Sequence, residues 1–384
     1  MQALRFFAPG LHCCDAQRKR MPKIVDIDII TMEYAIDPEL AYGTSRGLNF
    51  KRSSALIRVT TDEGVVGYGE GLGPVQPIKA YLGQLKSFFV GRSIYDFEIA
   101  SAYCKDRLYH FGFGHNTSVL SGINVALYDA IGKTLNVSAH NLIGGKRVDR
   151  VPCYATTGYV TKGTKITLES QLAKVDKKRF AGVKIKIGKG PQSDLERVKI
   201  ARQMLGDDMR LMVDVNGNYT VDICLQSLKL IEPYNIQWIE EPLPHGDLKG
   251  HAELRARSPI PIATGEGLSS LEEFSNLIEA RGVDVVQPAI GRCGGLGEAR
   301  KISTLAHLHN LRVAPAVWGG AFGLVAGIQF LASQPTTPHT ENDPFPTLLE
   351  YDIADNPLRD NVVNENLWPE EGGVVVAGER GHGA

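Results

Sequence analysis

After Gly144-Gly145 the chain repeats one structural unit, and this repeat constrains the fold more than any other feature of the sequence. Each unit has a short apolar run typical of a buried strand, followed by a loop and by apolar residues at helical spacing. The apolar runs read VPCYAT, VKIKIG, RLMVDVN, IQWIEEP, IPIATGE, VDVVQPA, LRVAPAVW and TLLEYD. Eight strands that alternate with helices predict a (β/α) barrel. An open doubly wound sheet is disfavoured because no GxGxxG sequence follows the first strand.

The sequence before the repeat predicts a unit of the α+β type. Alternating residues from Ile24 to about Glu70 predict antiparallel strands with a hairpin turn at 62–64, and helical spacing follows from about Gln76 to Leu142. The predicted divisions are a leader over 1–20, an α+β domain over 21–145, a barrel over 146–351, and a C-terminal segment over 352–384 that packs back on the α+β domain. The leader is too short for a secretory signal and its positive charge comes too late. An upstream start and a disordered leader both remain open for it.

Charge and cysteine content favour a cytoplasmic protein that acts on small molecules. Lys and Arg number 42 and Asp and Glu 43, so the formal charge of -1 provides no field to attract nucleic acid or an anionic membrane. No run approaches the roughly 20 apolar residues of a membrane-spanning helix. The 6 cysteines are scattered without a CxxC, which indicates neither a zinc site nor a disulfide framework.

Three consecutive strands of the repeat end in carboxylates, namely Asp214, Glu240 and Glu266. They are spaced by one βα unit, so they are expected side by side at the rim of the barrel. Unpaired carboxylates crowded together are unfavourable, and a hard divalent cation would stabilise them. Oxygen ligands without nearby His or Cys favour magnesium over zinc. Any one of the three, taken alone, is equally well explained as the cap of the following helix.

The stretch AGVKIKIG places Lys184 and Lys186 on one face of a strand and apolar residues on the other. Taken alone, the stretch favours an edge strand with one wet face. A barrel has no edges, and this strand directly precedes the carboxylate strands. The lysines are therefore expected to face the same mouth. A second ammonium group and a cation would lower the pKa of a lysine there, which suits a general base.

The ordered motifs of the chain resemble the mandelate racemase and muconate lactonising branch of the enolase superfamily. The resemblance covers about Met21 to Val376 and rests on Lys184-x-Lys186, Met212-Val-Asp214-Val-Asn216, Trp238-Ile-Glu240-Glu241-Pro242, Thr264-Gly-Glu266 and Gln287-Pro288-x-x-x-Arg292-Cys-Gly-Gly. It implies a (β/α)7β barrel with the α+β domain as a cap, in a homo-oligomer. It also implies one Mg2+ per subunit on Asp214, Glu240 and Glu266, with Lys186 as the base and Lys184 as its partner. Glu350 resembles the residue that polarises or protonates the substrate carboxylate, and Asn216 and Arg292 are expected to bind substrate.

The chemistry that this resemblance implies is removal of the proton α to a carboxylate, which gives a metal-stabilised enediolate. Dehydration or cycloisomerisation of a sugar acid or its lactone is expected to follow, because the ending LLEYDIADNPLRD resembles acid-sugar enzymes of the branch. Much of the branch has an Asp and a His on the face opposite the lysine, where this chain has Ala289 and Ala316. A racemase or epimerase, and a catalytically disabled carboxylate-binding homologue, therefore remain alternatives. Substrate selection is expected in the cap loops 34–50 and 71–77.

Overall fold

The computed structural model describes residues 21–107, 114–163, 165–335, 346–363, 367–376 and 381. The expected leader, residues 1–20, lies outside these ranges. In the described part of the chain, no helix combines the length and the apolar character needed to cross a membrane.

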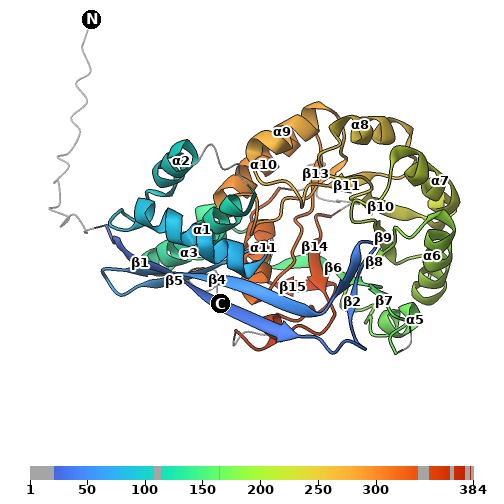
Figure 1. Ribbon diagram of the computed structural model, residues 1–384, viewed down its shortest axis with the longest axis horizontal. Helices are drawn as coiled ribbons and strands as arrows, with labels where there is room; N and C mark the ends of the chain where they lie inside the picture. The colour runs from blue at the N-terminus through green and yellow to red at the C-terminus, as the bar shows by residue number, and fades with distance from the viewer. Residues whose placement is uncertain are drawn as a thin grey trace, which may run out of the picture.

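The N-terminal region is an antiparallel sheet covered by helices, as the sequence predicts. Strands β1 (Ile24–Ala35), β4 (Lys51–Thr61) and β5 (Val66–Gly71) pair in the order β1-β4-β5. The predicted hairpin turn lies between β4 and β5. Helices α1 (Val75–Phe89), α2 (Phe97–Arg107) and α3 (Gly114–Leu135) complete this region, which lies beside the barrel in Figure 1.

Glycines on β5 allow helix α3 to pack directly against the strand. A Cβ atom at Gly67 would collide with the carbonyl oxygen of Ala126, and one at Gly69 would collide with that of Gly122. The alternating glycines in VGYGEG therefore leave room for the backbone of α3, since only glycine permits so close an approach. This packing fixes β5, whose last residues reach the barrel.

The repeat folds into the predicted barrel, and each of the eight apolar runs contains a strand. The strands are parallel and pair in the order β14-β6-β8-β9-β10-β11-β12-β13. Their bounds are β6 (Arg150–Thr157), β8 (Gly182–Lys186), β9 (Arg210–Asp214), β10 (Ile236–Glu240), β11 (Ile262–Thr264), β12 (Val285–Val286), β13 (Arg312–Val313) and β14 (Leu349–Asp352). The predicted (β/α)7β fold with an N-terminal α+β domain is confirmed.

Helices connect the successive barrel strands and form the outer layer of the barrel. They are α5 (Leu168–Leu172), α6 (Pro191–Leu205), α7 (Val221–Ile231), α8 (Leu248–Arg257), α9 (Leu271–Glu279), α10 (Leu296–Leu308) and α11 (Ala321–Ala332), with a short 3-10 turn η2 (Glu232–Tyr234) after α7. Figure 1 shows α6 to α10 along the outer edge of the barrel.

A layer of buried apolar side chains fills the interior of the barrel. It is one buried cluster, with members from β6, β9, β10, β11 and β12 and from the segments next to β13 and β14: Tyr154, Met212, Trp238, Ala263, Val285, Ala314 and Leu348. Strands from all around the curled sheet meet in this cluster, so the interior is a packed core and not a pore.

Short elements join the two regions. Strand β2 (Tyr42–Thr44) pairs with β3 (Gly47–Asn49) on one side and with β7 (Val160–Thr161), which follows the first barrel strand, on the other. After β14 come α12 (Pro357–Asp360) and β15 (Gly373–Val375), and β15 pairs with β6. Gly381 bridges to Ser138, next to α4 (Ala139–Leu142).

The packed layer gives a test of the barrel core. Met212 is fully buried in it, so Met212→Ala should lower the free energy of unfolding by about 2–5 kcal/mol, as lost transfer energy and a residual cavity combine. Urea denaturation measures this change. The control is Leu308→Ala, since Leu308 is 76% exposed and its truncation should change stability by less than about 0.5 kcal/mol. Equal effects of the two substitutions would contradict a packed interior at Met212.

Candidate active site

Strand β8 has one apolar face and one face that carries two lysines, and both faces are buried. Val183, Ile185 and Ile187 pack in the layer between the sheet and the outer helices. The alternating residues Lys184 and Lys186 therefore point into the barrel, and they are only 1% and 6% exposed. The edge-strand reading of AGVKIKIG is wrong, since a wet strand face would leave both ammonium groups in water.

Lys184 is enclosed by carboxylates from other strands. Its Nζ donates to Glu240 Oε1, lies 2.8 Å from Glu350 Oε1, and is 3.9 Å from Asp214 Oδ2. Burial favours the neutral amine, but the charges of Glu240 and Glu350 outweigh it and raise the pKa of Lys184 well above its usual value. Lys184 is therefore a fixed positive charge at the mouth.

Lys186 forms an ion pair with Asp214 on the neighbouring strand β9. Its Nζ is 2.5 Å from Asp214 Oδ2 and 5.9 Å from the centre of the Tyr159 ring. Burial and Lys184 act to lower the pKa of Lys186, yet Asp214 outweighs them and raises it. The lowered pKa expected from the sequence is thus not found while Asp214 is paired with Lys186. The prediction rested on the second lysine and a bound cation, and it did not include the carboxylate in direct contact.

Asp214 and Glu240 are adjacent across the sheet, because β9 and β10 pair them in register. Glu240 Oε2 accepts hydrogen bonds from Trp238 Nε1 at 3.2 Å and from Gln287 Nε2 at 2.7 Å. Burial raises the pKa of Glu240 to about 8, with Lys184 opposing the shift and Asp214 adding to it. Burial also acts to raise the pKa of Asp214, but the two lysines hold it below its ordinary value.

Glu266 follows β11 and lines the cavity over the barrel. Burial and the charges of Glu241 and Asp214 raise the pKa of Glu266 well above its usual value. Carboxylates outnumber ammonium groups at this mouth. The two lysines therefore do not provide enough positive charge to keep the pKa values of Glu240 and Glu266 in their ordinary range. This surplus, on oxygen donors from three adjacent strands, fits a hard divalent cation.

The three predicted ligands do not yet form a coordination site. Within the described residues, no three His, Cys, Asp or Glu side chains converge on a point that could hold a metal. Instead Lys186 bonds to Asp214 and Lys184 bonds to Glu240. Each lysine thus bonds to an oxygen atom of a carboxylate that the resemblance assigns to magnesium.

Glu350 on β14 lies among these groups, as its position in the sequence predicts. Its Oε1 accepts a hydrogen bond from Thr156 Oγ1 at 2.7 Å, and its Oε2 accepts one from the Val317 amide at 2.9 Å. Burial acts to raise the pKa of Glu350, but Lys184 and Lys186 hold it below its usual value. Glu350 is therefore ionised, and it anchors both Lys184 and the loop after β13.

The two residues expected to bind substrate have unused polar atoms. Asn216 has a φ of 55°, its amide donates to Asp214 Oδ1 at 2.8 Å, and its carbonyl accepts from Arg46 Nε at 2.6 Å. Its Oδ1 is buried without a hydrogen-bond partner in the described part of the chain, and so is Nε of Arg292. Arg292 lines the cavity over the barrel, whereas Asn216 is not part of its lining.

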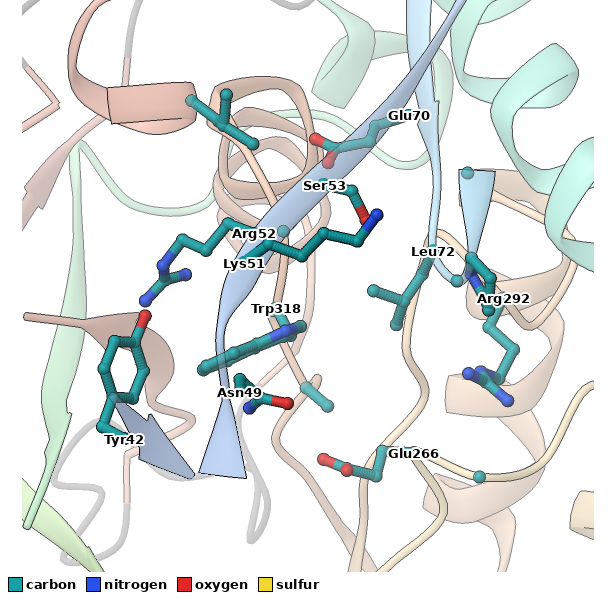
Figure 2. A pocket seen from close by; sticks show the side chains of 17 residues that line it. Tyr42, Asn49, Lys51, Arg52, Ser53, Glu70, Leu72, Glu266, Arg292 and Trp318 are labelled. Atoms are coloured by element: carbon teal, nitrogen blue, oxygen red, sulfur yellow. The ribbon is translucent and has the colours of Figure 1, made fainter. Parts of the chain in front are cut away.

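A cavity of about 560 Å³ lies between the two regions of the chain. Its walls come from the cap and from the barrel loops, and Figure 2 shows Lys51, Arg52 and Leu72 of the cap around the same space as Trp318, Arg292 and Glu266 of the barrel. Ala316 lines this cavity, and Ala289 is buried outside its lining. The positions where the branch often has an acid–base dyad thus carry only methyl groups.

Sequence reasoning missed a buried ion pair that joins the cap to the barrel. Arg52 on β4 lies 2.5 Å from Asp352 on β14, and its guanidinium stacks 4.9 Å from the centre of the Trp318 ring. Asp352 also accepts a hydrogen bond from Tyr159 at 2.7 Å, and the Tyr159 ring lies under Lys186. No local pattern could reveal this pair. Gln287 and Trp238, by contrast, stood in the recognised motifs without an assigned role.

Comparisons with known proteins identify the family of this chain. Residues 27–144 match the mandelate racemase/muconate lactonizing enzyme N-terminal domain, and residues 167–384 match the enolase C-terminal domain-like family. The chain belongs to the mandelate racemase and muconate lactonizing branch of the enolase superfamily. It is 33% identical over 358 residues to D-galactarolactone cycloisomerase from Agrobacterium fabrum, across 92% of this chain and 94% of that protein.

Other relatives extend this comparison. Arabinonate dehydratase from Saccharolobus solfataricus is 29% identical over 334 residues, which are 85% of this chain and 86% of that protein. The crystal structure of 3,6-anhydro-D-galactonate cycloisomerase from Zobellia galactanivorans is 29% identical, with a TM-score of 0.83 over 94% of this chain and 96% of that one. A racemase from Streptomyces coelicolor A3(2) with bound magnesium shares the fold at 24% identity, with a TM-score of 0.82 over 94% of this chain and 96% of that one. The chain is thus an enzyme of a superfamily whose relatives here are lyases and isomerases.

The buried charges predict a large effect of neutralising Lys184. In metal-free protein, Lys184→Met should lower the free energy of unfolding by about 3–5 kcal/mol, because Glu240 and Glu350 lose the charge that compensates their burial. The control is Arg257→Met, which breaks an exposed pair with Glu253 and should cost about 0–1 kcal/mol. Urea denaturation in EDTA gives both values. A loss no larger than that of the control would show that Lys184 does not compensate these carboxylates.

Proposed function

We propose that this enzyme removes the proton α to a carboxylate of an acid sugar, with Lys186 as the base, and that dehydration or cycloisomerisation follows. One observation carries the proposal: Lys184 and Lys186 are buried at the carboxyl end of β8, where Lys184 pairs with Glu240 of β10 and Lys186 pairs with Asp214 of β9. Catalytic groups of barrels lie at these strand ends.

Magnesium is the metal that the donor set fits. Asp214, Glu240 and Glu266 would hold one Mg2+ per subunit, because they are oxygen donors on three adjacent strands with a surplus of negative charge. When bound, the cation would supply positive charge to the substrate carboxylate.

The remaining groups bind and orient the substrate. Lys184 is a permanent positive charge, so it pairs with a substrate carboxylate and favours the charge that develops there on proton loss. Glu350 keeps Lys184 in place from β14. Asn216 and Arg292 offer their unpartnered polar atoms to the hydroxyl or carboxylate groups of the substrate.

Proton removal needs the neutral amine of Lys186. The amine becomes available once Asp214 no longer bonds to it, because burial and Lys184 both favour the uncharged form. The proton from the substrate α-carbon then passes to Lys186 Nζ. The acid that assists a leaving group remains unassigned, since Ala289 and Ala316 have no ionisable atoms.

Acid sugars are the substrate class that the relatives support. The first relatives named above act on a galactarolactone, an arabinonate and a 3,6-anhydrogalactonate. The cavity walls are rich in polar and charged groups, including Asn49, Lys51 and Ser53 from the cap, which suits a hydroxylated substrate. We further propose a cytoplasmic homo-oligomer that binds neither nucleic acid nor membranes.

Ala289 and Ala316 also favour a second candidate function, the binding of a carboxylate without turnover. A disabled homologue could keep the metal ligands and lose its acid–base groups. The racemase alternative is weaker, since transfer between two faces needs a second base opposite Lys186. Exchange of the substrate α-proton separates these three candidates.

The first functional prediction concerns magnesium. Incubation of the protein with a library of acid sugars in D2O and Mg2+ should place deuterium at the α-carbon of its substrate, and EDTA should abolish this exchange. Mass spectrometry and proton NMR detect the label. Exchange that is unaffected by chelation would exclude the metal role of Asp214, Glu240 and Glu266, and no exchange with any acid sugar would favour the binding protein.

The second functional prediction concerns the base. Lys186→Ala should slow α-proton exchange by about 10² to 10⁴. It should leave Mg2+ binding, measured by calorimetry, undiminished, because the substitution frees Asp214 from its ion pair. In the unmodified protein only one α-epimer should exchange. Equal labelling of both epimers would contradict a one-base mechanism and would support the racemase alternative.

A further inference from the structure

We infer that Glu70 of the N-terminal domain caps helix α11 of the barrel and thereby positions the loop 317–320, which walls the cavity. Glu70 is the penultimate residue of β5, and Gly320, the N-cap residue of α11, lies 250 residues later in the chain. The capping contact stands on its own, whereas its effect on substrate binding rests on the proposed function.

Helix α11 has no capping group of its own. The residue at its N-cap is Gly320, which has no side chain to accept a hydrogen bond, and its first turn contains no acidic residue. The first amides of a helix have no partners within the helix and need an acceptor from elsewhere. Other helices of this barrel use a local side chain, as Asp247 does for α8 by accepting from the Gly250 amide.

Glu70 supplies the missing acceptor from the other domain. Its Oε1 accepts the Gly320 amide at 2.8 Å, and its Oε2 accepts the Gly323 amide at 2.9 Å. Ser54 Oγ, from the neighbouring strand β4, donates to Oε1 at 2.7 Å. The side chain is buried, and a carboxylate at a helix N-terminus is also favoured by the helix dipole. Glu70 therefore does for α11 what an N-cap side chain does for an ordinary helix.

The start of α11 is built to admit this carboxylate. A Cβ atom would lie 2.7 Å from Glu70 Oε1 at Gly319, 3.3 Å from both carboxylate oxygens at Gly320, and 3.3 Å from Oε2 at Gly323. Side chains at these positions would press on the carboxylate or displace it. Three glycines around one buried side chain indicate a site shaped for Glu70.

The contact with Glu70 fixes one end of the loop 317–320, and Glu350 holds the other end. Val317 donates its amide to Glu350, which bonds to Lys184, and Gly320 donates its amide to Glu70. Between them lies Trp318, which lines the cavity and stacks on Arg52. A shift of Glu70 therefore moves the cavity wall at Trp318.

The same segment of the cap also holds the loop after β12. The amide of Leu72 donates to the carbonyl of Gly291 at 2.8 Å, next to Arg292. Figure 2 shows Glu70, Leu72, Trp318 and Arg292 around one cavity. Glu70 touches none of the proposed proton-transfer groups, so it is a positioning residue that links cap docking to the shape of the cavity.

The test compares Glu70→Gln with Asp247→Asn, a matched loss of charge at the ordinary cap of α8. Amide hydrogen exchange should show protection at Gly320 and Gly323 reduced roughly tenfold in Glu70→Gln and unchanged in Asp247→Asn. Steady-state α-proton exchange on the best acid sugar should show KM raised several-fold in Glu70→Gln with kcat nearly unchanged. Asp247→Asn should leave both kinetic constants unaltered.

A second variant keeps the test decisive if Glu70→Gln fails to fold. Gly323→Ala favours the helix by about 1 kcal/mol while its methyl group presses on Glu70, so KM should rise without a fall in thermal stability. Unchanged amide protection in Glu70→Gln would overturn the inference. An unchanged KM in both Glu70→Gln and Gly323→Ala, or in whichever of the two folds, would also overturn it. If the unmodified protein exchanges no substrate proton, the proposed function fails instead, and amide exchange still decides the capping contact.

Discussion

The pairing of Lys184 and Lys186 with buried carboxylates is the interaction on which the rest of the structure depends. Two ammonium groups and several carboxylates are held out of water at the mouth of the barrel, and each would be strongly unfavourable alone. The arrangement is stable because β8 and β9 place Lys186 beside Asp214 in register, and because Lys184 reaches Glu240 on β10. Negative charge remains in excess, so the same site that stabilises the lysines is suited to a divalent cation.

The fold supports this charged cluster from below, from behind and from above. Below it, the layer that contains Met212 and Trp238 fills the barrel. Behind β8, the guanidinium of Arg197 on α6 donates to the carbonyl of Lys186 at 2.7 Å and so holds the end of the strand. Above it, buried carboxylates attach the cap to the barrel. Asp352 of the barrel accepts a hydrogen bond from Arg52 of the cap, and Glu70 of the cap accepts one from the Gly320 amide at the start of α11. Cap and barrel are thus linked by groups that lie at the edge of the cavity.

Much of the fold and of the candidate site could be predicted because the signals are local in sequence. Alternation in AGVKIKIG located β8 and its lysines, and the repeat of βα units placed Asp214, Glu240 and Glu266 on adjacent strands. The contacts of the cap could not be predicted, since Arg52 and Asp352 are 300 residues apart and the local pattern around each does not indicate its partner. The raised pKa of Lys186 in the metal-free site could not be predicted for the same reason, because the contact with Asp214 depends on side-chain packing across two strands.

The account requires the two lysines to exchange partners when the site is loaded, and one structure tests this directly. A crystal structure of the protein with Mg2+ and an unreactive hydroxycarboxylate should show one cation bound to oxygen atoms of Asp214, Glu240 and Glu266. Lys184 and Lys186 should then face the ligand, with their bonds to Glu240 and Asp214 broken. A cation bound elsewhere, or lysines still paired with these carboxylates beside a bound ligand, would contradict the account.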